Sequence, residues 1–209
     1  MVALLLGAFW AGPMVTLALF VLLSFVGLIE LLILTRALKA PSHRSKKWFW
    51  RMAAPLWIAV PLCGFVDLFS PFSPQLATGW FVLIWAQDTG AYLVGTAIGR
   101  HKMWPRLSPG KTWEGWLGGT AITLALASQM PAWTAQFAPV DQLASAEWLT
   151  LAALIAVFGT LGDLLESVLK RQCGAADSGS IFPGHGGVLD RFDAVFLAAP
   201  ACYIYLHLL

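Results

Sequence analysis

Charged residues are scarce in this sequence. Only 11% of its 209 residues are Asp, Glu, Lys or Arg, whereas 58% are hydrophobic and the mean hydropathy is +0.72. Soluble domains carry about 25% charged residues. The composition therefore excludes an ordinary soluble domain and indicates a protein that crosses a membrane several times.

Two further features are missing. The cysteines Cys63, Cys173 and Cys202 have no CxxC spacing, so they predict neither a zinc site nor a thiol redox centre. We expect them to be small apolar fillers. Residues 1–29 contain no Lys or Arg, so they do not have the basic start of a secretory signal peptide.

Apolar runs of about 20 residues, the length that crosses a bilayer, follow one another along the chain. They predict an all-α, polytopic transmembrane helical protein with six full spans and a partial N-terminal one at residues 1–12. We expect one integral-membrane domain, 1–209, in which 1–84 holds N-terminal spans and 85–209 carries the chemistry. The full spans are placed at residues 13–36, 52–70, 75–98, 113–130, 148–169 and 192–209.

The charges between these spans predict their orientation. Residues 36–51 contain six basic side chains and no acid, and residues 100–111 contain four basic side chains and no acid. Both loops are expected to be cytoplasmic by the positive-inside rule. The loop 131–147 has two acids and no Lys or Arg, which suits the outside, and the next span returns the loop 170–191 to the cytoplasm.

The densest polar cluster lies between positions 163 and 193, which hold five of the 11 acidic residues. Asp163, Glu166, Ser167 and Lys170 fall at i, i+3, i+4 and i+7, so they share one face of a helix. A solvated helix end with an ion pair would also explain this face. Because the carboxylates lie within an apolar run, where charge is costly, we favour a functional site.

The loop that follows is rich in glycine. Residues 183–187, Pro-Gly-His-Gly-Gly, cannot continue a helix, and glycines let backbone N–H groups approach a phosphate closely. Asp190 and Asp193 then share a face at the start of the last span. Paired carboxylates can hold a hard cation such as Mg²⁺. Favourable charges at a helix N-terminus would explain the same pair.

A third polar block begins at Asp88, inside an apolar run. The basic loop after it, residues 100–111, suits the binding of a nucleoside triphosphate or a lipid phosphate. A loop that binds anionic lipid would explain the basic residues but not Asp88.

The Gly-x-x-x-Gly spacings at 95/99 and 115/119 indicate close helix packing. The role of Glu30, within the first full span, stays open.

At these residues the sequence resembles the phosphatidate cytidylyltransferases, or CDP-diacylglycerol synthases. The matching residues are Ser167, Lys170, Arg171, Asp177, Gly179, 183–187, Asp190, Arg191 and Asp193, with 88–92 and 108–115 upstream. Ala176 stands where the family has a lysine, and the N-terminal region and the middle loops are short.

The resemblance implies transfer of a cytidylyl group from CTP to phosphatidate in a bacterial cytoplasmic (inner) membrane, with the active site facing the cytosol. It implies Mg²⁺ as the cofactor and leaves a second cation open. It also implies contact with membrane lipids and assembly as a homodimer, and no nucleic acid is expected as a partner. The expected metal ligands are Asp177, Asp190 and Asp163. The expected catalytic residues are Lys170, Arg171, His185, Asp190, Arg191 and Asp193. The expected substrate-binding residues are Asp88, Ser108, Lys111, Ser167, Gly186 and Gly187.

Three alternative functions compete with this interpretation. The signature of the CDP-alcohol phosphatidyltransferases is absent from the sequence. An anion transporter would spread polar residues through several spans near the midplane, whereas here they gather in loops and at one side. An inactive homologue with a lipid-binding or scaffold role is motivated by Ala176, but Asp190 and Asp193 are both present.

Overall fold

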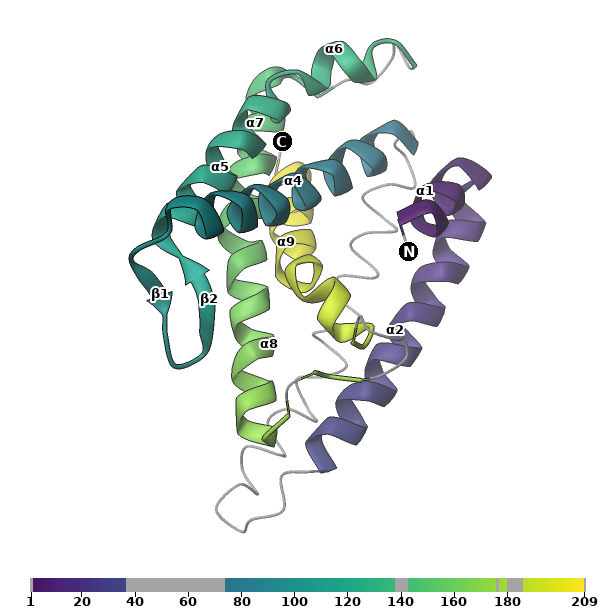
Figure 1. Ribbon diagram of the computed structural model, residues 1–209. Helices are drawn as coiled ribbons and strands as arrows, with labels where there is room; N and C mark the ends of the chain where they lie inside the picture. Colours follow the sequence, from purple (N-terminus) through teal and green to yellow (C-terminus); the bar gives the residue numbers. More distant parts are fainter. Residues whose placement is uncertain (1, 37–73, 138–142, 176, 180–185, 209) are drawn as a thin grey trace.

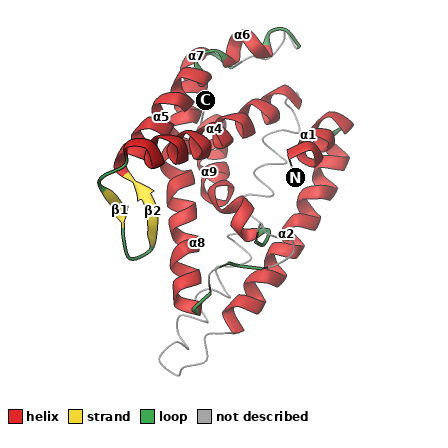
Figure 2. Cartoon of the chain, viewed as in Figure 1, coloured by secondary structure: helices red, strands yellow, loops and turns green. Residues whose placement is uncertain are grey.

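The computed structural model describes residues 2–36, 74–137, 143–175, 177–179 and 186–208 (Figure 1). Helices make up most of this part of the chain (Figure 2). The helices are α1 (Val2–Ala11), α2 (Pro13–Arg36), α4 (Pro74–Ile98), α5 (Trp113–Ala127), α6 (Met130–Thr134), α7 (Ser145–Leu154), the π-helical turn η2 (Ile155–Gly159), α8 (Thr160–Cys173) and α9 (Leu189–His207).

Three helical segments are long and apolar enough to cross a membrane: α2, α4 and the continuous run Ser145–Cys173 formed by α7, η2 and α8. They confirm the spans predicted at 13–36, 75–98 and 148–169, and with them a membrane protein. The span predicted at 52–70 lies outside the described residues.

The other two predicted spans are helical but do not meet the same criterion. Helix α5 has 15 residues, a length of about 22 Å at 1.5 Å per residue. This is shorter than the hydrocarbon core of about 30 Å. Helix α9 has 19 residues, but Asp190, Arg191 and Asp193 occupy its first turns. The six-span arrangement therefore stays a prediction.

A β-hairpin departs from the all-α expectation. Strands β1 (Lys102–Trp104) and β2 (Ser108–Thr112) pair antiparallel, and the N–H of Leu107 donates to the carbonyl of Trp104 at 3.1 Å to close the turn. The strands are too short to show an alternating pattern, so nothing in the sequence separated them from a loop.

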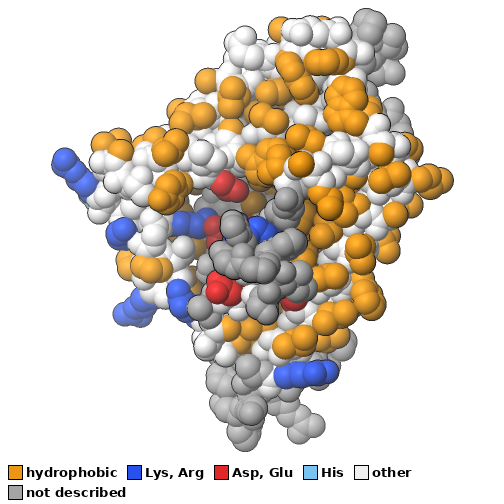
Figure 3. All heavy atoms as spheres, turned by 45° about the vertical axis from the view of Figure 1, so that its right-hand side comes forward, with side chains coloured by type: hydrophobic (Ala, Val, Ile, Leu, Met, Phe, Trp, Pro, Cys, Tyr) orange, Lys and Arg blue, Asp and Glu red, His pale blue; other side chains and the backbone are white. Residues whose placement is uncertain are grey.

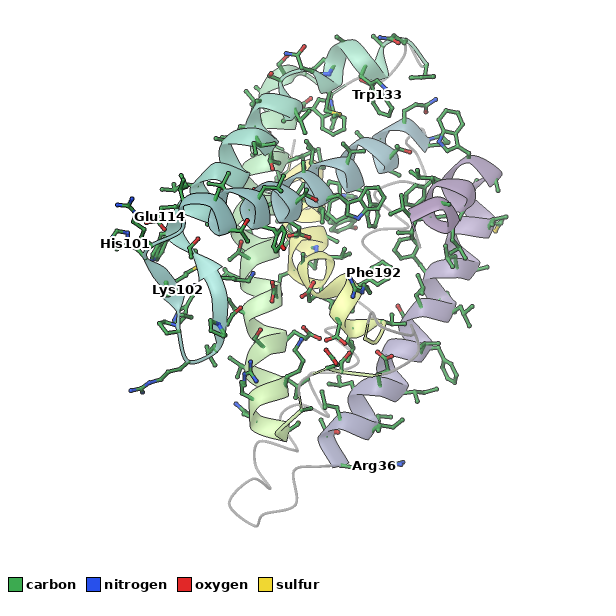
Figure 4. The ribbon with its side chains drawn as sticks, viewed as in Figure 1. Arg36, His101, Lys102, Glu114, Trp133 and Phe192 are labelled. Atoms are coloured by element: carbon green, nitrogen blue, oxygen red, sulfur yellow. The ribbon has the colours of Figure 1, made fainter. Side chains whose placement is uncertain are left out.

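The hairpin is tied to the start of α5 by Glu114. Its carboxylate accepts hydrogen bonds from the backbone N–H groups of Arg100, at 3.2 Å, and His101, at 3.1 Å, and pairs with the His101 ring (Figure 4). The side chain of Thr112 caps α5 by accepting from the N–H of Gly115 at 3.1 Å. These contacts fix β2, and Lys111 with it, against the helices.

Helices α4 and α5 pack with their backbones in contact. A Cβ at position 115 would lie 2.6 Å from the carbonyl oxygen of Ala91, and one at position 119 would lie 2.7 Å from that of Gln87. Only glycine fits at these positions, which confirms the close packing predicted from the 115/119 spacing. The hydroxyl of Thr123 donates to Oε1 of Gln87 at 3.1 Å, so polar groups also join the two helices.

Helix α9 lies between α2 and α8 (Figure 1). Phe192, near its start, projects toward α2 and meets Phe20 edge to face, with ring centroids 6.4 Å apart (Figure 4). Phe20 also contacts Phe9 of α1 and Phe81 of α4. This aromatic cluster joins four helices and sets the position of the first turns of α9.

The surface separates apolar from charged regions. Hydrophobic side chains cover much of the face in Figure 3, whereas most of its Lys, Arg, Asp and Glu side chains lie on the left and in the middle. Helix α2 contributes many of the exposed apolar side chains: Met14, Val15, Val21, Leu22, Phe25, Ile29, Leu32 and Ile33. An exposed apolar surface of this extent suits contact with lipid.

Candidate active site

The site is built where α8 and α9 touch. A Cβ at position 162 would lie 2.2 Å from the carbonyl oxygen of Asp193, so only glycine allows this contact between the two backbones. The contact brings Asp163 beside Asp193. Glu166 lies one turn further along α8, on the same face as Asp163. One carboxylate oxygen from each of these three residues lies within 4.8 Å of the others.

These three carboxylates form a donor set that suits a divalent cation. Glu166 is fully buried, and its Oε1 atom has no hydrogen-bond partner within the described part of the chain. Buried polar atoms are normally paired, and carboxylates this close repel one another unless a cation lies among them. Hard oxygen ligands favour Mg²⁺ or Ca²⁺ over softer metals.

Two lysines offset part of the negative charge. Lys111, from β2, forms an ion pair with Asp163. The Nζ atom of Lys170 lies 2.8 Å from Oε2 of Glu166 and 2.8 Å from Oδ1 of Asp190. Lys170 therefore connects the carboxylate cluster to the start of α9.

Asp190 holds the segments that precede α9. Its Oδ2 atom accepts hydrogen bonds from the N–H and the hydroxyl of Ser178, at 2.9 and 2.8 Å, and from the N–H of Gly187, at 2.8 Å. Burial raises the pKa of this carboxyl, but its hydrogen bonds from Lys170, Gly187 and Ser178 outweigh burial and hold the pKa below its usual range. Asp190 is therefore ionised at neutral pH.

A cavity of about 330 Å³ adjoins the cluster. Asp163 belongs to both the cavity wall and the cluster, so the two are continuous. The cavity is bounded by α4, the hairpin, α5 and α8. Its polar lining includes Gln87, Asp88, Thr96, Lys111, Thr112, Thr160 and Asp163. Its wall is braced by Trp116, whose Nε1–H donates to the carbonyl of Ala156 in η2 at 2.9 Å. Such π-helical turns occur often at functional sites.

Several predicted site residues lie in the carboxylate cluster, in the wall of the adjoining cavity or in contact with these groups: Asp88, Lys111, Asp163, Lys170, Asp190, Asp193 and Gly187. Gly186 lies against Asp190 with a φ of +77°, where glycine is favoured. Ser167 is buried on α8. Ser108 begins β2.

Other predicted residues lie away from the carboxylates or cannot be placed. Arg171 is exposed, and its Nε–H donates to the carbonyl of Leu107 in the hairpin at 3.4 Å. Arg191 is exposed on the first turn of α9. Asp177 is also exposed, and the described residues form no group of three metal-ligating side chains around it. His185 and Ala176 lie outside the described residues, and the assignment of Asp177 and Asp190 as metal ligands stays a prediction.

The sequence predicts no role for two residues that the structure places at the candidate active site, Glu166 and Glu30. Glu166 lies on the polar face that the sequence predicts for α8, and its i, i+3 relation to Asp163 inside an apolar run could have identified it as a candidate ligand. Glu30 accepts hydrogen bonds from the backbone N–H groups of Val188 and Leu189, 158 and 159 residues along the chain. No local sequence signal predicts a partner at that separation.

Comparison with known proteins extends this description. The model of the cytidylyltransferase family matches residues 1–209. A phosphatidate cytidylyltransferase of Bacillus subtilis is 46% identical over 127 residues, covering 61% of this chain and 45% of the relative. Those of Staphylococcus saprophyticus and Staphylococcus aureus are 44% and 43% identical over 128 residues, each covering 60% of this chain and 46% of the relative. The aligned parts thus span a little under half the length of these relatives.

Proposed function

Because this chain belongs to the cytidylyltransferase family, we propose that it transfers a cytidylyl group from CTP to phosphatidate, giving CDP-diacylglycerol and pyrophosphate. The observation that carries the proposal is the meeting of Asp163, Glu166 and Asp193 within 4.8 Å of one another, beside a cavity lined in part by Asp88 and Lys111. The names of the similar bacterial proteins support the choice of CTP and phosphatidate.

In this reaction no protein side chain needs to form a covalent bond with a substrate. An oxygen of the lipid phosphate forms a bond to the α-phosphorus of CTP, and the bond from that phosphorus to the oxygen leading to the β-phosphate breaks, releasing pyrophosphate. A phosphate monoester is largely ionised near neutral pH, so a general base is unnecessary. Positioning and neutralisation of negative charge are therefore the main tasks of the site.

Asp163, Glu166 and Asp193 would hold the divalent cation, for which Mg²⁺ is our proposal. When bound, the cation supplies charge neutralisation to phosphate oxygens. Asp177 and Asp190 remain the alternative ligands, and a second cation is left open. The buried Oε1 atom of Glu166, without a hydrogen-bond partner in the described part of the protein, supports the first ligand set.

The basic side chains would bind phosphate groups. Lys111 lines the cavity and reaches the carboxylates, so it can contact a triphosphate that extends from one to the other. Lys170 holds Glu166 and Asp190 in place. Arg171 and Arg191 are exposed on the last turn of α8 and the first turn of α9, and would contact anionic groups of either substrate.

The membrane arrangement is part of the proposal. We place the protein in a bacterial cytoplasmic membrane with six full spans, as one domain in which residues 85–209 carry the chemistry. The basic residues 100–111 support the proposal that the hairpin, and the cavity beside it, lie on the cytosolic side. Phosphatidate would enter sideways, since its acyl chains stay in the bilayer. The family resemblance suggests a homodimer.

Lys111→Met is expected to raise the KM for CTP by about tenfold, because it removes one charge-assisted hydrogen bond to phosphate. Steady-state kinetics with varied CTP at saturating phosphatidate measures this. Lys102→Met is the matched control, since Lys102 is exposed on β1 and does not line the cavity. A KM that rises for phosphatidate alone would contradict the assignment of Lys111 to the nucleotide.

The proposed function is tested by incubating the purified protein in detergent with CTP, phosphatidate and Mg²⁺. The expected result is formation of CDP-diacylglycerol and pyrophosphate in equal amounts, abolished by chelation of the metal. A second candidate, a weakened or inactive homologue, is motivated by Ala176. Folded protein that binds CTP but yields no product would support that candidate and contradict the proposal.

A further inference from the structure

Glu30 places a buried carboxylate against the segment that leads into α9. Its side chain is only 4% exposed, within the apolar helix α2. Oε1 accepts from the N–H of Val188 and Oε2 from the N–H of Leu189, both at 3.0 Å. These N–H groups belong to the N-cap residue and the first residue of α9, whose N-terminal end favours negative charge.

Two glycines make room for this carboxylate. A Cβ at position 179 would lie 2.4 Å from Oε1 of Glu30, and one at position 187 would lie 2.5 Å from Oε2. The backbone on both sides of the carboxylate is therefore in contact with it. Neither glycine could carry a side chain without displacing Glu30 or its own segment.

The same two segments are held from the other side by Asp190. Its Oδ2 atom accepts from the N–H groups of Ser178, next to Gly179, and of Gly187. Its Oδ1 atom accepts from Lys170, which also contacts Glu166. A continuous set of polar contacts thus runs from Glu30 through the start of α9 to the carboxylate cluster.

A buried carboxylate inside an apolar helix is costly. Within the described part of the chain, Glu30 is paired with the backbone N–H groups of Val188 and Leu189. We propose that Glu30 is a positioning residue, which fixes the first turn of α9 so that Asp190 and Asp193 stay in register with Asp163 and Glu166. The kinetic part of this inference rests on the proposed function; the structural part does not.

Glu30→Gln tests the inference with little change of shape, since one carboxylate oxygen becomes an NH₂ group that faces an N–H donor. We expect hydrogen exchange of the amides of residues 186–190 to accelerate by about tenfold or more, with α4 and α5 unchanged. We expect kcat to fall by about tenfold or more, as it does when a residue that orients metal-binding side chains is replaced. The KM values for CTP and phosphatidate should stay within about threefold, because Glu30 contacts neither substrate.

Glu147→Gln is the matched control. The carboxylate of Glu147 also accepts a backbone hydrogen bond at a helix start, from the N–H of Ala144 before α7. It lines neither the cavity nor the carboxylate cluster. This control variant should therefore keep the wild-type kcat within about twofold, although it loses the same kind of helix-terminal contact.

A second pair of variants keeps the test decisive if Glu30→Gln does not fold. Gly179→Ala pushes against Glu30 and should lower kcat, whereas Glu30→Asp, one methylene shorter, frees the space that the new methyl group needs. We express the kcat of each variant as a fraction of the wild-type kcat. The fraction for the double variant should be about threefold or more higher than the product of the fractions for the two single variants. Simple multiplication of the two effects would overturn the proposed contact.

The remaining outcomes also decide the inference. Unchanged exchange of residues 186–190 in Glu30→Gln would overturn it, and so would faster exchange with an unchanged kcat. If the wild-type protein forms no CDP-diacylglycerol, the proposed function fails. The exchange measurement then still shows whether Glu30 holds the start of α9.

Discussion

Asp193→Asn is expected to lower turnover by about a thousandfold or more, the scale of losing a metal ligand that serves phosphoryl transfer. This corresponds to about 4 kcal/mol of transition-state stabilisation. Asparagine keeps the shape of the side chain and can still accept the hydrogen bond from the N–H of Ala194, 2.7 Å from Oδ1 in the wild type. The fold should therefore survive. Initial rates of CDP-diacylglycerol formation at saturating Mg²⁺, with the thermal unfolding midpoint in detergent, measure both effects.

Asp177→Asn separates the two candidate ligand sets. Asp177 is exposed and lies outside the cluster of Asp163, Glu166 and Asp193. If that cluster holds the cation, Asp177→Asn lowers turnover by less than about tenfold. Wild-type rates for Asp193→Asn, together with an inactive Asp177→Asn protein, would contradict the three-carboxylate site.

Lys170→Met is expected to cost about 3 kcal/mol or more of stability, because it leaves buried negative charge without its cation. Lys170 has a side chain only 17% exposed and lies 2.8 Å from carboxylate oxygens of both Glu166 and Asp190. Turnover should fall by about a hundredfold or more, since Glu166 and the start of α9 lose their common partner. Thermal unfolding and initial rates of the same preparation measure the two effects.

A double variant distinguishes charge from packing in this result. Glu166→Gln removes the carboxylate that Lys170→Met would leave unpaired, so the double variant should recover part of the lost stability while staying inactive. A Lys170→Met protein as stable as wild type would contradict the buried ion-pair arrangement. Lys102→Met, which removes an exposed lysine on β1, serves as the control for loss of positive charge.

Much of the helical framework could be predicted from the sequence, because hydrophobic runs of membrane length require helices to satisfy their backbone hydrogen bonds. The polar face of α8 was also predictable from its spacing of three and four residues. The hairpin was not, because strands of three and five residues show no period.

The arrangement of the site depends on contacts between distant segments, which periodicity does not report. The carboxylate cluster forms because glycine at position 162 lets α8 meet the backbone of Asp193. Periodicity also does not report that the carboxylate of Asp190, which stays a predicted metal ligand, accepts hydrogen bonds from Lys170, Ser178 and Gly187. The partner of Glu30 was beyond sequence reasoning for the same reason.

The cation site on α8 and α9 is tested most directly by titrating the purified protein with Mn²⁺ and following free Mn²⁺ by electron paramagnetic resonance. Wild-type protein and Asp177→Asn are predicted to bind Mn²⁺ alike. Asp163→Asn and Asp193→Asn should each weaken binding by about tenfold or more. Undiminished binding by Asp193→Asn, or a loss of binding confined to Asp177→Asn, would contradict a site made by Asp163, Glu166 and Asp193.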